Sequence, residues 1–150
     1  MFELAALPVP VPVAALPAWL LAGPKPAPFI VLIEDDPAIA LMYMTQLTAA
    51  GYAAEMAGDV SSGMDLVRRR RPDLILLDLR LPQIEGFAVL EQVRDDPELQ
   101  AIPIVVLSNF GDPSVVGRAM TLGAREYLIK SQTTPPQLVE RIQRYVPSPG

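Results

Sequence analysis

The sequence contains no cysteine and no long, uninterrupted apolar segment. Without cysteine the chain has neither a disulfide framework nor a thiolate metal site, so its stability must come from packing. No apolar run approaches the roughly 18 residues that a transmembrane helix requires. The first residues also lack the basic segment of a secretory signal, since Glu3 leads and prolines interrupt the apolar stretches that follow. These absences favour a soluble, cytoplasmic protein without a membrane segment.

Charged residues are scarce over residues 1–28, which contain only Glu3 and Lys25 beside seven prolines. The two charges cancel, so the formal net charge of −5 belongs to residues 29–150. An acidic module of this size is a poor ligand for the phosphates of nucleic acids, and we expect no direct DNA binding. The alternating prolines predict an extended N-terminal extension, which is either a mobile tail or a strip that docks on a partner. Residues 14–22 could form one or two short helical turns.

From Phe29 onward, short apolar runs alternate with segments of helical period, the pattern of βαβ units around a parallel sheet. This pattern predicts strands over 29–33, 53–57, 74–77, 102–107 and 127–129. It predicts helices over 37–50, 60–67, 87–94, 113–122 and 135–146. With right-handed crossovers, five such units give an α/β fold, a flavodoxin-like, doubly wound, five-stranded parallel sheet of order 2-1-3-4-5 with five helices. We expect one domain over residues 29–146, followed by a short tail at 147–150.

Local signals refine this fold. The run 74–77 has no polar alternation, which predicts a central strand buried on both faces, whereas 53–57 is expected at an edge. Pro37 suits the first position of a helix capped by Asp36 or Asp35, and Gly123 suits a left-handed helix end. A turn is expected at 82–86. The inward-facing side chains of the first helix are predicted to be Ile39, Met42, Tyr43 and Leu47.

Polar side chains follow four of the predicted strands. The first strand ends at Glu34, Asp35 and Asp36, and the others end at Asp78, Ser108 and Lys130. Because the carboxyl ends of parallel strands lie along one edge of a sheet, where such folds place their ligand sites, these groups should meet there. Carboxylates suit a hard divalent cation, and a hydroxyl and an ammonium suit phosphoryl oxygens. The pattern therefore indicates phosphoryl chemistry on Asp78.

The same residues carry a family resemblance. Four segments, FIVLIEDD at 29–36, PDLILLDLRLP at 72–82, IPIVVLSN at 102–109 and GAREYLIK at 123–130, resemble a response-regulator receiver domain of the single-domain type. The intervals from Asp35 to Asp78, Ser108 and Lys130 in turn are 43, 30 and 22 residues, as a receiver needs. The resemblance covers about four-fifths of the chain.

The resemblance implies a role for each of these groups. Asp78 would be the phosphoacceptor. Its ionised carboxylate would attack the phosphorus of a phosphohistidine donor in line. Mg²⁺ would be bound by Asp78, by Asp35 directly, by Glu34 mainly through water, and by the backbone carbonyl of Arg80. Ser108 would hydrogen-bond one phosphoryl oxygen and Lys130 would neutralise another. For Asp36 the helix cap is the preferred interpretation. Without metal, the three carboxylates are expected to repel one another.

The resemblance also implies a conformational switch and protein partners. Ser108 would move toward the phosphoryl group, and Tyr127 would turn into the space that it leaves. A downstream protein would read the surface of the fourth helix, fifth strand and fifth helix, and a sensor histidine kinase or phosphotransfer protein would supply the phosphoryl group. No helix-turn-helix, catalytic or membrane segment follows Val146, so the module is expected to act through protein contacts unless it is a fragment. A plain core tyrosine is the alternative to this switch interpretation of Tyr127.

Several alternatives stay open at this point. A haloacid-dehalogenase-like phosphatase also uses a strand-end aspartate but needs a second one two residues later, where Arg80 stands. A flavodoxin-like binding module would be repelled by the acidic first loop, and a Ser108/Lys130 acyl-transfer pair lacks an oxyanion arrangement. A phosphorylation-independent receiver-like scaffold is the remaining rival. The run Arg68–Arg71 could bind nucleic acid, but cations at a helix end also complement the helix dipole.

Overall fold

The computed structural model describes residues 11–22, 26–79 and 85–147. Its five parallel strands are β1 (Phe29–Ile33), β2 (Ala53–Ala57), β3 (Leu74–Asp78), β4 (Ile104–Ser108) and β5 (Glu126–Ile129). They pair in the order β2-β1-β3-β4-β5, which confirms the predicted topology and places β2 at an edge. The helices that accompany the strands are α2 (Pro37–Ala49), α3 (Val60–Arg70), α4 (Glu85–Asp95), α5 (Pro113–Thr121) and α6 (Pro135–Ile142).

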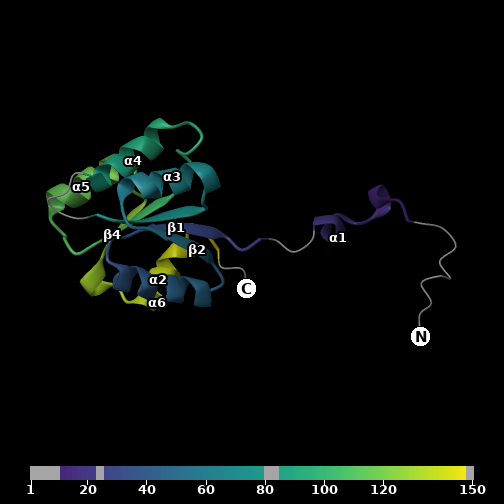
Figure 1. Cartoon of the computed structure of the whole chain (residues 1–150), viewed down its shortest axis with the longest axis horizontal. Coiled ribbons are helices and arrows are strands. Elements are labelled where there is room, and N and C mark those ends of the chain that lie inside the picture. The colour runs from purple at the N-terminus through teal and green to yellow at the C-terminus, as the bar shows by residue number, and fades with distance from the viewer. Residues whose placement is uncertain (1–10, 23–25, 80–84, 148–150) are drawn as a thin grey trace.

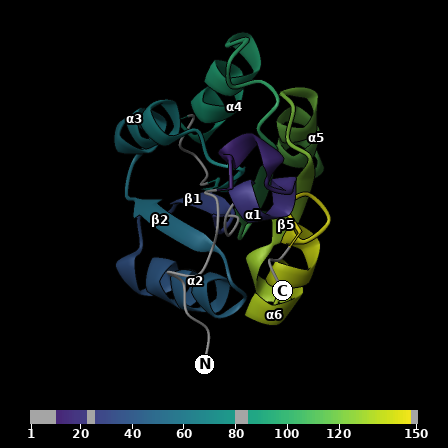
Figure 2. The same ribbon diagram turned by 90° about the vertical axis from the view of Figure 1, so that its right-hand side faces the viewer.

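The sheet lies between two layers of helices. Figures 1 and 2 show α3, α4 and α5 on one face and α2 and α6 on the other. Each face has its own apolar core, because alternate residues of a strand point to opposite faces. Leu74 and Leu76 belong to the core beneath α2 and α6, whereas Ile75 and Leu77 belong to the core beneath α3, α4 and α5. All four are fully buried, which confirms β3 as a central strand.

The helix ends follow from local chemistry. The Asp36 carboxylate accepts hydrogen bonds from the backbone N–H groups of Ala38 and Ile39, and it therefore caps α2 as predicted. Thr134 and Gln137 form a reciprocal capping box at the start of α6. Gly123, which follows α5, has φ of 107°, a left-handed conformation that glycine adopts without strain.

Some predicted boundaries and faces were wrong. The helix α6 ends at Ile142 rather than 146, because the chain continues as a tighter turn in which Tyr145 N–H donates to the Ile142 carbonyl. The helix α4 begins at Glu85 rather than 87, and β4 begins at Ile104 because Ile102 belongs to the preceding turn. On α2, Met42 is exposed and Ala40 takes the buried position.

Other predictions fall on parts of the chain that the structure describes incompletely. The turn predicted at 82–86 begins outside the described residues. Most of the tail at 147–150 also lies outside them, as do residues 1–10 and 23–25 of the N-terminal extension. Between these gaps, the extension contains a 3₁₀ turn, η2 (Val13–Ala15), and a short helix, α1 (Ala18–Ala22). Among the described residues, no helix is both long and apolar enough to cross a membrane.

Two helical glycines provide a test of the packing around β1. A Cβ added to Gly63 of α3 would lie 2.6 Å from Cδ1 of Ile33, whereas a Cβ on Gly117 of α5 would meet no atom within 4 Å. Both Gly→Ala changes gain about 1 kcal/mol of helix propensity, but overpacking at Gly63 costs about 1–3 kcal/mol. Urea unfolding should therefore show Gly117→Ala to be more stable than wild type and Gly63→Ala to be less stable than Gly117→Ala. Equal stabilisation of both variants would contradict the close contact between α3 and β1.

Candidate functional site

The carboxyl ends of four strands meet at one edge of the sheet, as predicted. In the parallel register, Ile33 lies opposite Leu77, Asp78 opposite Leu107, and Ser108 opposite Ile129. Glu34 and Asp35 directly follow β1, and Lys130 directly follows β5. The strand register alone therefore brings these chemically different side chains to a single place.

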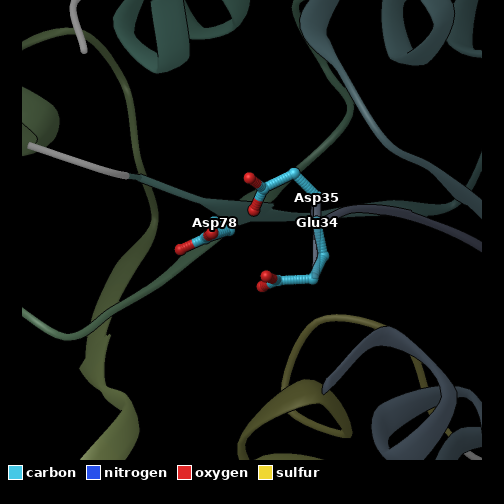
Figure 3. A group of neighbouring side chains, drawn as sticks. All are labelled: Glu34, Asp35 and Asp78. Atoms are coloured by element: carbon cyan, nitrogen blue, oxygen red, sulfur yellow. The ribbon is translucent and has the colours of Figure 1, made fainter. Parts of the chain in front are cut away.

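Three carboxylates gather at this edge. One oxygen from each of Glu34, Asp35 and Asp78 lies within 4.8 Å of the others. Figure 3 shows that Glu34 and Asp35 leave the end of β1 in opposite directions, with Asp78 from β3 between them. Glu34 is buried and Asp35 is exposed, so the cluster has a buried side and a solvent-facing side.

Lys130 supplies the positive charge on the buried side. Its Nζ donates to Oε2 of Glu34 at 2.8 Å and lies 3.1 Å from Oδ1 of Asp78. Burial alone would lower the pKa of the Lys130 ammonium, but its hydrogen bonds and attraction to the two carboxylates outweigh burial, and its pKa is raised. For Glu34 the balance is the reverse. Burial raises the pKa of its carboxyl group by more than the hydrogen bond with Lys130 lowers it. The expected repulsion among the carboxylates is therefore partly offset by this lysine.

The predicted switch residues are joined by a chain of hydrogen bonds. Ser108 is fully buried, and its hydroxyl donates to the Leu79 carbonyl at 2.7 Å. The Phe110 N–H donates to Ser108 Oγ at 3.2 Å, and the Tyr127 hydroxyl donates to the Phe110 carbonyl at 2.6 Å. The path therefore leads from the residue after Asp78, through the loop after β4, to the aromatic ring on β5.

Sequence reasoning missed three features of this site. It did not predict the bond between Lys130 and Glu34, or that Ser108 would use the backbone carbonyl of Leu79. It identified Tyr43 only as a core residue, although the charges of Glu34, Asp78 and Lys130 all act on its hydroxyl. Burial is the main cause of the raised pKa of Tyr43. The inward helical position and the polar end of the tyrosine ring are the signals that could have placed it near the site.

The donor set fits a hard divalent cation. Carboxylate oxygens are the ligands that Mg²⁺ prefers, and Mg²⁺ keeps several waters, so few protein ligands are needed. The three carboxylates and one ammonium leave an excess of negative charge that a divalent ion would balance. The backbone carbonyl of Arg80, predicted as a further ligand, lies outside the described residues.

The arginine run at the end of α3 has partners of its own. Arg69 pairs with Asp65 at 3.1 Å, Arg71 pairs with Glu98 at 2.6 Å, and Arg70 pairs with Glu55. Arg68 donates to the side-chain carbonyl of Gln92. Each guanidinium is therefore engaged within the protein, in agreement with the interpretation as a solvated helix end.

Comparisons with known proteins point to one family. The family profile for the response regulator receiver domain matches residues 30–143. Over 103 residues the chain is 38% identical to the DNA-binding dual master transcriptional regulator RpaA of Synechocystis, which covers 69% of this chain and 43% of RpaA. It is 29% identical over 117 residues to the polar-differentiation response regulator DivK of Brucella anthropi, 78% of this chain and 94% of DivK. The chain spans less than half the length of the first two curated relatives that it matches, RpaA among them, whereas it spans most of DivK.

Solved structures of response regulators superpose on this chain. The chemotaxis protein CheY4 of Vibrio cholerae superposes with a TM-score of 0.74 at 26% identity, over 81% of this chain and all of CheY4. The Mn²⁺-bound form of response regulator Rcp1 superposes with a TM-score of 0.69 at 27% identity, over 82% of this chain and 96% of Rcp1. A structurally similar protein therefore binds a divalent metal ion.

Proposed function

The chain belongs to the response regulator receiver family of two-component signalling, and from this membership we propose that Asp78 accepts a phosphoryl group from a phosphohistidine donor with the help of Mg²⁺. The donor is a sensor histidine kinase or a phosphotransfer protein. The observation that carries the proposal is the position of the Asp78 carboxylate at the end of the central strand, where an oxygen of Asp35 lies within 4.8 Å of one of its oxygens and Nζ of Lys130 lies 3.1 Å from Oδ1.

The proposed reaction is an in-line displacement at phosphorus. A carboxylate oxygen of Asp78 forms the new P–O bond, the P–N bond to the donor imidazole breaks, and the imidazole nitrogen keeps the electron pair. Asp35, Asp78 and the Arg80 carbonyl are the proposed ligands of Mg²⁺, with Glu34 acting mainly through water. When bound, the metal neutralises charge on the phosphoryl oxygens. The chain therefore assists its own phosphorylation and, with water as the acceptor, its dephosphorylation.

Ser108 and Lys130 are proposed to hold the transferred phosphoryl group. Lys130 already lies 3.1 Å from Asp78 and can neutralise a phosphoryl oxygen with little movement. Ser108 must first leave the Leu79 carbonyl, because a hydroxyl has a single proton to donate. Phosphorylation thus exchanges one hydrogen bond of Ser108 for another, and this exchange is the proposed start of the switch.

Tyr127 is the proposed reporter of that exchange. Its hydroxyl binds the Phe110 carbonyl, and the Phe110 N–H binds Ser108, so movement of Ser108 should disturb the environment of the ring. The affected surface, formed by α5, β5 and α6, is the one that we propose a downstream protein reads. The proposed receiver comprises residues 29–146, with 1–28 as an extension and 147–150 as a tail.

A switch of this kind predicts a change in NMR spectra. The ring resonances of Tyr127 should shift when a phosphoryl mimic is added to the magnesium-loaded wild type, because its hydrogen-bonded neighbour Phe110 moves with Ser108. Ser108→Ala should reduce the shift, since the path from Asp78 is cut. Identical ring environments with and without the mimic would remove Tyr127 from the switch and leave it a core residue.

Phosphoryl transfer itself is tested with acetyl phosphate. After incubation with Mg²⁺ and removal of the donor, hydroxylamine should release inorganic phosphate from the protein, because an acyl phosphate reacts with hydroxylamine and a phosphate ester of serine or tyrosine does not. A parallel sample with the metal chelated should release little. Phosphate that resists hydroxylamine would contradict a carboxylate acceptor.

A further inference from the structure

The strand β2 has an open edge. Among the described residues β1 is the only strand that pairs with it, and Figure 2 shows β2 at the side of the sheet, with α3 above and α2 below. The Ala53 N–H donates to the carbonyl of the residue before β1, and the Ala57 carbonyl accepts from the residue after β1. Because successive residues of a strand direct their backbone groups to opposite edges, those of Ala54 and Met56 point outward.

This open edge lacks the usual protection against pairing with another chain. Edge strands are commonly blocked by charged side chains, proline or bulges. Glu55 is the one charged residue of β2, and its carboxylate already pairs with Arg70 of α3. The five residues of β2 pair with β1 in unbroken register, and Met56 is 50% exposed. A further strand can therefore add beside Met56.

Residues 7–12 of the N-terminal extension, here called the arm, have the pattern of a strand that pairs on one side only. They read Leu-Pro-Val-Pro-Val-Pro, and 7–10 lie outside the described residues. In an extended strand the three prolines, which lack an N–H, would share one edge, and the N–H groups of Val9 and Val11 would share the other. Valine favours strands, and proline is tolerated where its edge faces solvent. The arm can therefore extend a sheet by one strand and end it.

The described part of the extension leads away from its own sheet. Figure 1 shows α1 well apart from the strands and from the helices that cover them. Pro26 and Pro28 restrict the chain just before β1, which favours an extended spacer. Val11, the first described residue, is 61% exposed. The extension therefore presents the arm to another molecule rather than to the β2 of its own chain.

We propose that the arm of one copy of this chain adds as an antiparallel strand to the open edge of β2 in a second copy, and that the two copies exchange arms. The backbone groups of Val9 and Val11 then pair with the outward groups of β2. Because each copy offers the same arm and the same edge, the exchange has two-fold symmetry and gives a closed dimer. The outer edge of the added strand carries the prolines, so it offers no N–H groups to a third chain. Phosphorylation of Asp78 plays no part in this pairing.

The antiparallel direction follows from the side chains. In an antiparallel pair, residues that exchange hydrogen bonds lie directly opposite each other, with Cα atoms about 5.5 Å apart and side chains on the same face. The valines of the arm then cover the exposed side chain of Met56. In a parallel pair they would lie on the other face of the sheet, beside the charged Glu55. Burial of apolar surface therefore favours the antiparallel arrangement.

Exchange of proline and valine in the arm tests the pairing in the full chain. Val11→Pro removes an N–H from the pairing edge, whereas Pro10→Val, the matched control, adds an N–H to the outer edge only. Sedimentation equilibrium should show a dimer for wild type and for Pro10→Val. A lost backbone hydrogen bond weakens pairing about 3- to 10-fold and the dimer contains two arms, so Val11→Pro should raise the dissociation constant about 10- to 100-fold. A monomeric wild type, or equal dissociation constants for the two variants, would overturn the proposal.

Disulfide cross-linking identifies the edge, because the chain has no cysteine of its own. A chain with Val9→Cys or Val11→Cys is mixed with a tagged chain with Met56→Cys and mildly oxidised. One of the two arm positions should link to this tagged chain in preference to a tagged control with Met120→Cys on α5, since Met120 is similarly exposed at 43%. Equal linkage to both tagged chains would place the arm elsewhere and overturn the docking on β2. A disulfide within one chain that carries both an arm substitution and Met56→Cys would overturn the exchange between copies.

Discussion

Replacing Lys130 with methionine is expected to lower the free energy of unfolding at pH 7 by about 3 kcal/mol, the usual cost of removing one partner from a buried ion pair. The change leaves Glu34 and Asp78, whose side chains are 2% and 6% exposed, facing each other without their common cation. Methionine keeps most of the apolar stem, so the loss reports charge rather than volume. Urea unfolding in the absence of divalent metal ions provides the measurement.

Three conditions should reduce this loss. Adding Asp78→Asn to the lysine variant removes one of the two opposed charges and should restore part of the stability. Mg²⁺ should also restore part of it, because an ion that binds only the folded state stabilises that state by mass action. Acidification should do the same, because the pKa of Glu34 is raised in the folded state. Below the unfolded pKa of a glutamate, about 4.3, Glu34 is protonated in both states and its charge costs nothing. The cost grows as the pH rises from there through the folded-state pKa. A loss that is independent of pH and of Mg²⁺ would contradict the charge account.

Asp78→Asn alone gives a complementary expectation. Without Mg²⁺ this variant should be at least as stable as wild type, because it removes one of three clustered carboxylates while Lys130 keeps its bond to Glu34. Thermal melts of the two proteins in a metal-free buffer provide the comparison. A clearly less stable variant would mean that the carboxylates do not oppose one another.

The second large effect is expected at Asp35. Asp35→Asn should lower Mn²⁺ affinity by about 100-fold or more, and the rate of phosphorylation by acetyl phosphate at limiting Mg²⁺ should fall with it. The physical reason is that the variant removes a charged oxygen, the proposed metal ligand, from the exposed side of the cluster. Asp36→Asn is a matched control one residue away, since it makes the same charge change and asparagine caps a helix as well as aspartate does. Equal losses of Mn²⁺ affinity in the two variants would show that the loss comes from the change in overall charge and not from the removal of a ligand at Asp35.

The sequence allowed the edge of the sheet to be predicted because that edge depends on strong local signals. Leu74–Leu77 is uniformly apolar and is followed by Asp78, and a short run of this kind is typical of a parallel strand buried on both faces. Once the strands are parallel, their ends must share an edge, and the meeting of Glu34, Asp35, Asp78 and Lys130 follows. The cap at Asp36 could be predicted equally well, because the proline at the next residue fixes where the helix begins.

The contacts inside the site could not be predicted from the sequence in the same way. Spacing places a lysine, two acidic groups and a hydroxyl together but does not say which oxygen each donor takes. Lys130 could have bound Asp35 or Asp78 alone, and its choice of Glu34 depends on the opposite directions in which consecutive side chains leave β1. Ser108 binds a backbone carbonyl, a group that every residue carries and no motif reveals. The exposed position of Met42 likewise depends on tertiary packing, and the early end of α6 depends on the tighter turn after Ile142.

Asp78 is the proposed acceptor of the phosphoryl group, and intact-protein mass spectrometry after incubation with acetyl phosphate and Mg²⁺ detects the transfer. Wild type should gain the mass of one phosphoryl group, and Asp78→Asn, under the same conditions and with its fold verified, should gain none. An unmodified wild type, or a variant that is modified to the same extent, would contradict the account.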